Sequence, residues 1–433
     1  MSQHSNKGLS RRNLIKGGIG LAAVGGLAWA RPADQGEANH SAYFQSMSQS
    51  LHSHNVATPS LVVDKTIMGN NIQTLVRHLK SRFDYRIVAK SLPSIEMLKW
   101  TMAQADTQKL MVFHQPFLSL VANEIPQADV LMGKPMPIAA VETFYNDLVE
   151  KKTPFDSQTQ LQWLLDSQHR LLQYAQLAKG IKQHLNINIE LDIGLHRGGV
   201  NNDSELIAML DIIEQNEYLT FSGFMGYEPH IGKVPGDPIS HRDQAMDTYR
   251  NYVALAEKHL GRSVQDLTLN AAGSPTYQYY NEGEASAWPM NELSSGSCLV
   301  KPSDFDLPTL ADHQAAAFIA SPVLKVLDET QIPGVTGLGK IMAMWNQNWQ
   351  KTFFAYGGYW KANPISPKGL TLNPVYGRSS NQEMYNGSAR VQLKQDDFIF
   401  LRPTQSEAVF LQFGDILVFE HGVLRDRWPV MRG

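Results

Sequence analysis

The sequence has few cysteines and few clustered basic residues, two features that would each indicate a particular class of protein. It contains one cysteine, Cys298, so an intrachain disulfide is excluded and the fold must depend on its hydrophobic core. It has no run of Lys and Arg outside the extreme N-terminus, and its formal net charge is -3. Without a basic stripe that could follow phosphates, a nucleic-acid-binding role is excluded.

A long apolar run is also lacking at the N-terminus. Residues 17–27 are uncharged but short and rich in glycine, which is too little to cross about 30 Å of hydrocarbon. Arg11 and Arg12 precede this stretch, and a small-x-small pattern follows at 28–30. The pattern predicts that residues 1–30 are a twin-arginine signal peptide, and that bacterial twin-arginine machinery exports the chain to the periplasm.

The remaining chain is long enough for two domains, because 433 residues with 43% hydrophobic content can bury more than one core. Residues 31–56 are polar and weakly patterned, so we expect a spacer there. The folded body is expected to begin at about residue 57.

Short apolar runs alternate with segments of helical periodicity over 57–288. This rhythm predicts an α/β fold, a (β/α)₈ barrel of TIM type. A doubly wound open sheet is the competing topology, but polar residues recur directly after several strands, where barrel enzymes place their sites. The eight expected strands are 60–63, 86–89, 110–113, 129–132, 162–165, 187–192, 221–225 and 267–270.

The rhythm changes after about residue 290, where strand-like runs are joined by Gly, Pro and Asn turns without long helices between them. We therefore expect a mostly β domain over 289–433. Its expected strands are 318–326, 351–357, 389–393, 397–401 and 415–420.

Four clusters of polar or glycine residues follow expected barrel strands. Lys90 ends the second strand, and a lysine enclosed by barrel walls would be held as a neutral amine able to attack an aldehyde. Taken alone, Lys90 is better explained as a solvated strand-end lysine. Arg197 lies in Asp-Ile-Gly-Leu-His-Arg-Gly-Gly, where glycines bring the backbone close to a ligand, although an exposed turn is the alternative.

The third and fourth clusters follow the last two expected strands. Tyr227 and His230 bring a phenol and an imidazole together, and His230 is a candidate proton-transfer group or else a structural histidine. Gly273, Ser274 and Thr276 offer backbone N–H groups and hydroxyls, which is how late barrel loops hold phosphate. A generic turn is the alternative for this last stretch.

Taken in order, these motifs resemble the D-threonine aldolase and D-serine dehydratase family of pyridoxal-phosphate (PLP) enzymes, which have an alanine-racemase-like fold. The stretch at 58–64, Asn-Glu-Leu-x-x-Gly at 291–296 and Trp-Pro-Val-x-Arg-Gly at 428–433 resemble the same family. The resemblance implies a PLP-binding barrel over 57–288, a D-serine dehydratase-like β domain over 289–433, and a homodimer. The resemblance of residues 1–30 to a twin-arginine signal, a route that moves folded proteins, implies in turn that an exported enzyme could acquire its cofactor in the cytoplasm first.

The resemblance implies a role for each cluster. Lys90 is then the lysine that binds PLP as a Schiff base, Arg197 and Tyr227 line the cofactor, and residues 273–276 bind its phosphate. The substrate is expected to be a small amino acid.

The sequence departs from the family at its metal site. Relatives carry His-x-Cys or His-x-Asp near the C-terminus, whereas this chain keeps His421 and has Val423 in the second position. A single histidine would hold a divalent metal poorly, since such sites usually have three protein ligands. Two further departures, outside the metal pair, also replace polar groups. Ser-Glu-Glu-His of the family becomes Ser-Glu-Ala-Val at 406–409, and Thr-His-Lys after the strand lysine becomes Ser-Leu-Pro at 91–93.

Three functions remain open from the sequence. The first is a PLP-dependent lyase, an aldolase or dehydratase of a small D-β-hydroxy amino acid, which in the family uses the metal. The second is a PLP-dependent racemase or epimerase, which needs no metal and to which the loss of the second ligand gives weight. The third is a PLP-binding protein without turnover.

Overall fold

The computed structural model describes residues 31–79 and 82–432, so the expected export signal at 1–30 lies outside the described residues. The chain divides into two compact units. The larger comprises residues 49–320, 360–363 and 402–432, and the smaller comprises 31–48, 321–359 and 364–401. Within the described residues, no helix is both long and apolar enough to cross a membrane.

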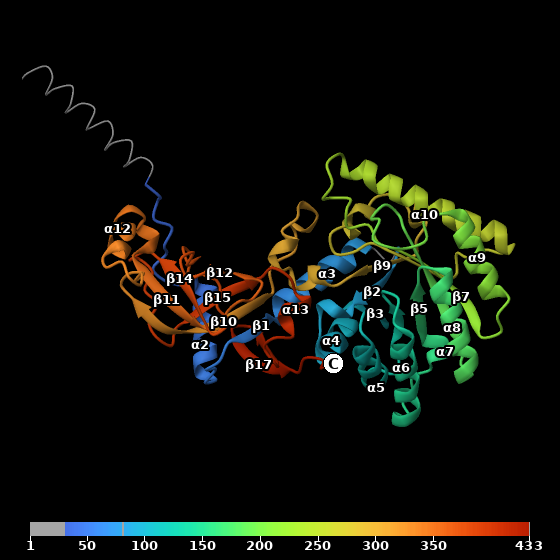
Figure 1. The fold of residues 1–433 in the computed structure, drawn as a ribbon, viewed down its shortest axis with the longest axis horizontal. Helices are drawn as coiled ribbons and strands as arrows, with labels where there is room; N and C mark the ends of the chain where they lie inside the picture. The colour runs from blue at the N-terminus through green and yellow to red at the C-terminus, as the bar shows by residue number, and fades with distance from the viewer. Residues whose placement is uncertain (1–30, 80–81, 433) are drawn as a thin grey trace, which may run out of the picture. The chain divides into compact units, whose positions relative to one another are not determined.

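The larger unit contains a closed barrel of parallel strands surrounded by helices (Figure 1), which confirms the predicted fold class. Every neighbouring pair of strands is parallel, as helical crossovers between strands require. The strands are β2 (Asp84–Val88), β3 (Lys109–Val112), β4 (Asp129–Met132), β5 (Leu161–Leu165), β6 (Leu185–Leu191), β7 (Leu219–Gly226), β8 (Thr268–Ala271) and β9 (Glu292–Ser295).

Several of the crossover helices begin where the sequence supplies a capping side chain. Ser94 accepts a hydrogen bond from the Met97 N–H at one helix start, and Asn202 and Asp237 cap two others in the same way. The helices are α3 (Lys65–Leu79), α4 (Ile95–Ala105), α5 (Gln115–Glu124), α6 (Ile138–Lys151), α7 (Ser157–Gln160), α8 (Gln168–Ile181), α9 (Asp203–Glu214) and α10 (Pro238–Leu260).

The barrel differs from the prediction at its first and last strands. Residues 60–63 form β1 (Ser60–Asp64), which pairs with β10 (Ala317–Leu327) and β16 (Ile416–Glu420) and lies outside the barrel. The barrel is closed instead by β9, beyond the expected boundary at 288. The expected place of β1 was wrong because a short apolar run does not indicate which sheet it joins. The sequence carried no sign of β9 because Glu-Leu-Ser-Ser is mostly polar.

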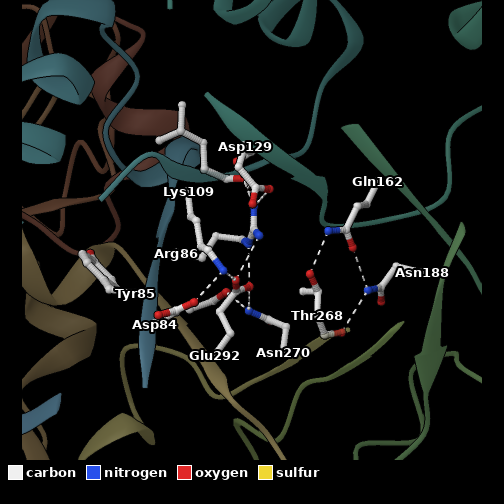
Figure 2. Close-up of polar contacts among 12 residues, drawn as sticks. Asp84, Tyr85, Arg86, Lys109, Asp129, Gln162, Asn188, Thr268, Asn270 and Glu292 are labelled. Atoms are coloured by element: carbon white, nitrogen blue, oxygen red, sulfur yellow. Dashed lines mark hydrogen bonds and ion pairs between the residues drawn. The ribbon is translucent and has the colours of Figure 1, made fainter. Parts of the chain in front are cut away.

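The polar residues of β9 are explained by a polar layer in the barrel interior near the strand starts (Figure 2). The Arg86 Nε donates to the Glu292 Oε1 at 2.5 Å, and the Asn270 Nδ2 donates to the same oxygen at 2.8 Å. Lys109 donates to the Glu292 Oε2 at 2.9 Å. On the other side of this layer, Gln162 donates to the Thr268 hydroxyl at 2.7 Å. Most of these buried polar atoms are paired, which makes their burial tolerable; the Asn188 and Asn270 Oδ1 atoms are exceptions.

The smaller unit contains antiparallel strands, as expected for the β region. The later part of β10 pairs with β11 (Lys351–Tyr356), which pairs with β14 (Gln382–Gly387), which pairs with β13 (Thr371–Leu372). The other strands after the barrel are β12 (Ala362–Ser366), β15 (Phe398–Pro403) and β17 (Val423–Trp428), and the helices are α11 (Ser297–Val300), α12 (Leu338–Trp345) and α13 (Glu407–Phe410).

Two further expectations were wrong. Residues 389–393 form no strand; there, the Val391 N–H donates to the Ser388 carbonyl in a turn. The expected spacer at 31–56 contains the helix α2 (Ala42–Ser53), in which Met47 and Leu51 are fully buried. These two side chains lie one turn apart on one helix face, a pattern too sparse to stand out in a polar segment.

Candidate active site

A pocket opens at the carboxyl ends of the barrel strands, where barrel enzymes place their sites. It holds about 540 Å³ of space not filled by protein atoms, counting the part that is open to solvent. Its floor is apolar, because Met111, Leu131, Leu164 and Met225 form a buried cluster on which Val88, Phe113 and Tyr227 pack. Lys90, Arg197, Tyr227 and Glu407 are the ionisable side chains among the described residues that line it.

Lys90 follows β2 in a single turn of 3₁₀ helix, η1 (Ala89–Ser91). Its Nζ lies 4.6 Å from the centroid of the Phe113 ring and 3.6 Å from the Glu407 Oε1. The side chain is 43% exposed, so barrel walls do not enclose it as the sequence suggested. The amine instead reaches an open pocket with a carboxylate beside it.

Arg197 and Tyr227 come together from the loops after β6 and β7. The guanidinium carbon lies 5.1 Å from the centroid of the Tyr227 ring. Burial, followed by the charge of Glu228, raises the pKa of Tyr227 to about 12, so the phenol keeps its proton at neutral pH. The arginine loop needs glycine, since a Cβ at Gly199, where φ is +93°, would meet the Asp192 nitrogen at 2.6 Å.

Glu190, near the end of β6, is an acidic neighbour of Arg197. Burial raises its pKa to about 7, and the nearby negative charge of Asp166 adds to this, whereas Arg197 opposes it. Asp192 instead accepts hydrogen bonds from the N–H groups of Gly194 and His196, which help to lower its pKa although burial opposes them. The charge of Arg197 therefore lies near an acidic strand end.

The loops after β8 and β9 meet on the opposite side of the pocket. The Ser274 Oγ accepts hydrogen bonds from the N–H groups of Gly296 and Cys298, both at 3.1 Å. A Cβ on Gly273 would lie 2.7 Å from the Tyr227 ring, and one on Gly296 would lie 2.6 Å from the Val88 carbonyl oxygen. Small residues are therefore required for these loops to approach the pocket so closely.

Residues 273–274 and 296–297 together form a cradle at the pocket wall. Thr276 supports this cradle without lining the pocket. It is fully buried, and its hydroxyl donates to the Glu228 Oε1 at 2.7 Å and accepts from the Gly273 N–H at 3.1 Å. Of the three residues predicted to hold phosphate, Gly273 and Ser274 line the pocket, and Thr276 holds their loop from behind.

The two predicted histidines do not line the pocket. His230 packs against Gly194, where a Cβ would lie 3.0 Å from the imidazole Nε2, and burial lowers its pKa. His421 is exposed in the turn between β16 and β17. Among the described residues, no group of three His, Cys, Asp or Glu side chains could hold a metal ion. The donor set for a metal near His421 is therefore incomplete.

Sequence reasoning missed two parts of the pocket lining. Ser294, Ser295, Gly296 and Ser297 carry the same small-residue signal as 273–276, but it was hidden because β9 was not recognised as a strand. Glu407 stands in the Ser-Glu-Ala-Val stretch at 406–409, which by itself indicates no place in the barrel pocket. It lies more than 300 residues from Lys90 in sequence, and no local pattern connects the two.

The residues present fit PLP, an aromatic aldehyde that carries a phosphate. Lys90 offers an amine to the aldehyde, and Arg197 and Tyr227 offer a cationic and an aromatic wall. The loops at 273–274 and 296–297 offer the backbone N–H groups of Ser274 and Ser297 and the Ser274 hydroxyl. The close approach of these loops to the pocket supports this fit, because a Cβ at Gly273 or Gly296 would collide with the Tyr227 ring or the Val88 carbonyl oxygen.

Comparisons with known proteins agree with this architecture. A family model described as the alanine racemase N-terminal domain matches residues 63–303. The structure resembles D-threonine aldolase from Filomicrobium marinum, with a TM-score of 0.68, 15% identity, and coverage of 87% of this chain and 96% of that chain. A search of curated protein sequences gives no match.

Two further solved structures show the same fold at low identity. D-threo-3-hydroxyaspartate dehydratase from Delftia sp. HT23 matches with a TM-score of 0.63 and 14% identity, covering 87% of this chain and 98% of that one. Alanine racemase from Bacillus anthracis matches with a TM-score of 0.64 and 12% identity, covering 86% and 97%. Similar structures of this fold thus include both lyases and a racemase.

Proposed function

The chain belongs to the alanine racemase N-terminal domain family, and on this basis we propose that it is a PLP-dependent enzyme of a small amino acid, with the cofactor attached to Lys90. The observation that carries the proposal is the convergence of three features in one pocket. These are a lysine amine, an arginine stacked on a tyrosine, and a cradle of Gly and Ser residues.

The residues that line the pocket have separate roles in this proposal. The Lys90 amine would hold the cofactor, and from the same place in the pocket it could move a proton at the substrate Cα. Arg197 and Tyr227 orient the ring, and the loops at 273–274 and 296–297 anchor the phosphate. When bound, PLP supplies a sink for the electrons that remain at the Cα.

For the reaction, we favour a lyase acting on a small D-β-hydroxy amino acid. The ordered motifs support it, and so do the aldolase and the dehydratase among the similar structures. Racemisation is the second candidate, because His421 lies outside the pocket lining and Val423 replaces the second ligand. A cofactor-binding protein without turnover is the third.

We also propose that the protein is exported by the twin-arginine route and works as a homodimer. The paired arginines at 11 and 12 support export, and the family resemblance supports the dimer. Fractionation of cells that express the full chain tests the first proposal, and light scattering on the purified protein tests the second.

The decisive experiment adds PLP to the purified protein and records its visible absorption. Wild type is expected to gain the band of a lysine-bound cofactor, and Lys90→Ala to gain none. A panel of D- and L-amino acids, with and without EDTA, then separates the candidates. Aldehyde, ammonia or keto acid identifies a lyase, the opposite enantiomer identifies a racemase, and no change identifies a carrier. A wild-type protein that gains no band would refute the proposal.

A further inference from the structure

Glu407 is the one carboxylate among the described residues that line the pocket, and it faces the Lys90 amine at 3.6 Å. The two side chains are 34% and 43% exposed, and ion pairs that are open to water to this degree contribute little to stability. Structural stabilisation therefore does not explain why this pair is present in the pocket.

The backbones that carry the two residues are tied together by three buried hydroxyls. The Ser91 Oγ, next to Lys90, hydrogen-bonds to the Ser297 Oγ at 2.9 Å. The Ser297 Oγ in turn lies 3.4 Å from the Ser406 Oγ, next to Glu407. Because these serines are buried, the fold holds the backbones at Lys90 and Glu407 close together, so that the two side chains can reach one another.

The other ionisable side chains that line the pocket are unsuited to accept a proton from the amine. The guanidinium of Arg197 stays charged at any physiological pH. Tyr227 stays protonated near neutral pH, because burial and the charge of Glu228 raise its pKa to about 12. A carboxylate beside the amine is the remaining acceptor in the pocket lining.

We propose that Glu407 is the proton-exchange partner of Lys90. The ammonium gives a proton to the Glu407 carboxylate, and the free amine forms its bond to the aldehyde carbon of PLP, with loss of the aldehyde oxygen as water. When a substrate amine later displaces the lysine, Glu407 returns the proton to Nζ. This role rests on the proposed function, but it holds for either a lyase or a racemase, because both must load and release Lys90.

The test measures the rate at which PLP attaches to cofactor-free protein, followed by the visible band, so no substrate is needed. E407Q keeps the size of the side chain and removes the acid–base group. We expect attachment to slow by on the order of 10²-fold, with the final band as intense as in wild type. E407D is expected to recover much of the rate.

The matched control is E420Q. Glu420 lies 3.3 Å from Lys65 in a pair of similar exposure, but it does not line the pocket, so its removal should leave the attachment rate unchanged. Melting temperatures show whether each variant is folded, and E407D provides a second test if E407Q is not. E407Q attachment at the wild-type rate overturns the proposal for Glu407 alone, whereas a wild type without a band overturns the proposed function.

Discussion

Arg86 and Glu292 form a bidentate ion pair inside the barrel, and neither side chain is exposed. The Nε and Nη2 of the arginine donate to the two carboxylate oxygens at 2.5 and 3.0 Å. Lys109 donates to the same carboxylate, and the Arg86 Nη1 donates to the Asp129 Oδ1 at 3.0 Å. The pair connects the strand that leads to Lys90 with the strand that leads to the serine cradle.

Removal of Glu292 should therefore be costly. Glu292→Ala leaves Arg86 buried without its main partner, and we expect a loss of about 3–5 kcal/mol in the free energy of unfolding, measured with urea. Glu214→Ala is the control, since its pair with Arg262 is about half exposed on each side and should contribute about 0–1 kcal/mol. Equal effects of the two changes would contradict a structural role for the buried pair.

The raised pKa of Glu190 predicts that the free energy of unfolding falls as the pH rises. Its pKa is about 7 in the folded protein, against an ordinary value of 4.5, because burial and Asp166 disfavour the charge. Between these values the folded state holds a proton that the unfolded chain has released, so stability falls as the pH rises from 4.5 to 7. Glu190→Gln should flatten this part of the stability profile, measured by urea unfolding across that range. An unchanged slope would contradict the assignment.

The cradle gives a third prediction. In Gly273→Ala, the added Cβ would lie 2.7 Å from the Tyr227 ring, so the tyrosine or the loop must shift. We expect PLP to bind about tenfold or more weakly, as measured by titration of the visible band, because a displaced loop no longer presents its N–H groups correctly. Gly180→Ala is the control: it lies in α8 with no atom within 4 Å of the new Cβ, and should leave binding unchanged. Identical affinities would show that residue 273 is not part of the cofactor site.

The sequence was sufficient for the rhythm of the barrel and for most of the pocket, because strand ends and glycine-rich loops leave local signals. It was not sufficient for β9, whose polar residues are explained only by partners such as Arg86, about 200 residues away in sequence. The role of β1 was missed because an apolar run does not specify which strands it pairs with. Tertiary pairing decided each of these features, and a single sequence does not record it.

Thr276 and His230 illustrate the same limit at the site. Each follows a barrel strand as a site residue should, yet Thr276 turns behind the loop toward Glu228, and His230 packs against Gly194. Position after a strand places a residue at the correct end of the barrel. Whether its side chain enters the pocket depends on the course of the loop.

The last prediction concerns the metal. His421 is exposed in a hairpin turn, it does not line the pocket, and the neighbouring Glu420 is paired with Lys65 at 3.3 Å. We therefore expect His421→Ala to change the activity found in the amino-acid panel by less than about twofold, and EDTA to have equally little effect, since one histidine provides fewer than the usual three protein ligands.

Addition of Zn²⁺ or Mn²⁺ after EDTA treatment is the companion measurement, and we expect no gain in rate. A strong loss with EDTA that divalent metal restores in wild type but not in His421→Ala would contradict this prediction. In that case His421 would hold a metal with donors other than a cluster of His, Cys, Asp and Glu among the described residues. The proton-exchange role of Glu407 would stand, because attachment of PLP to Lys90 is measured without substrate and before any β-hydroxyl is bound.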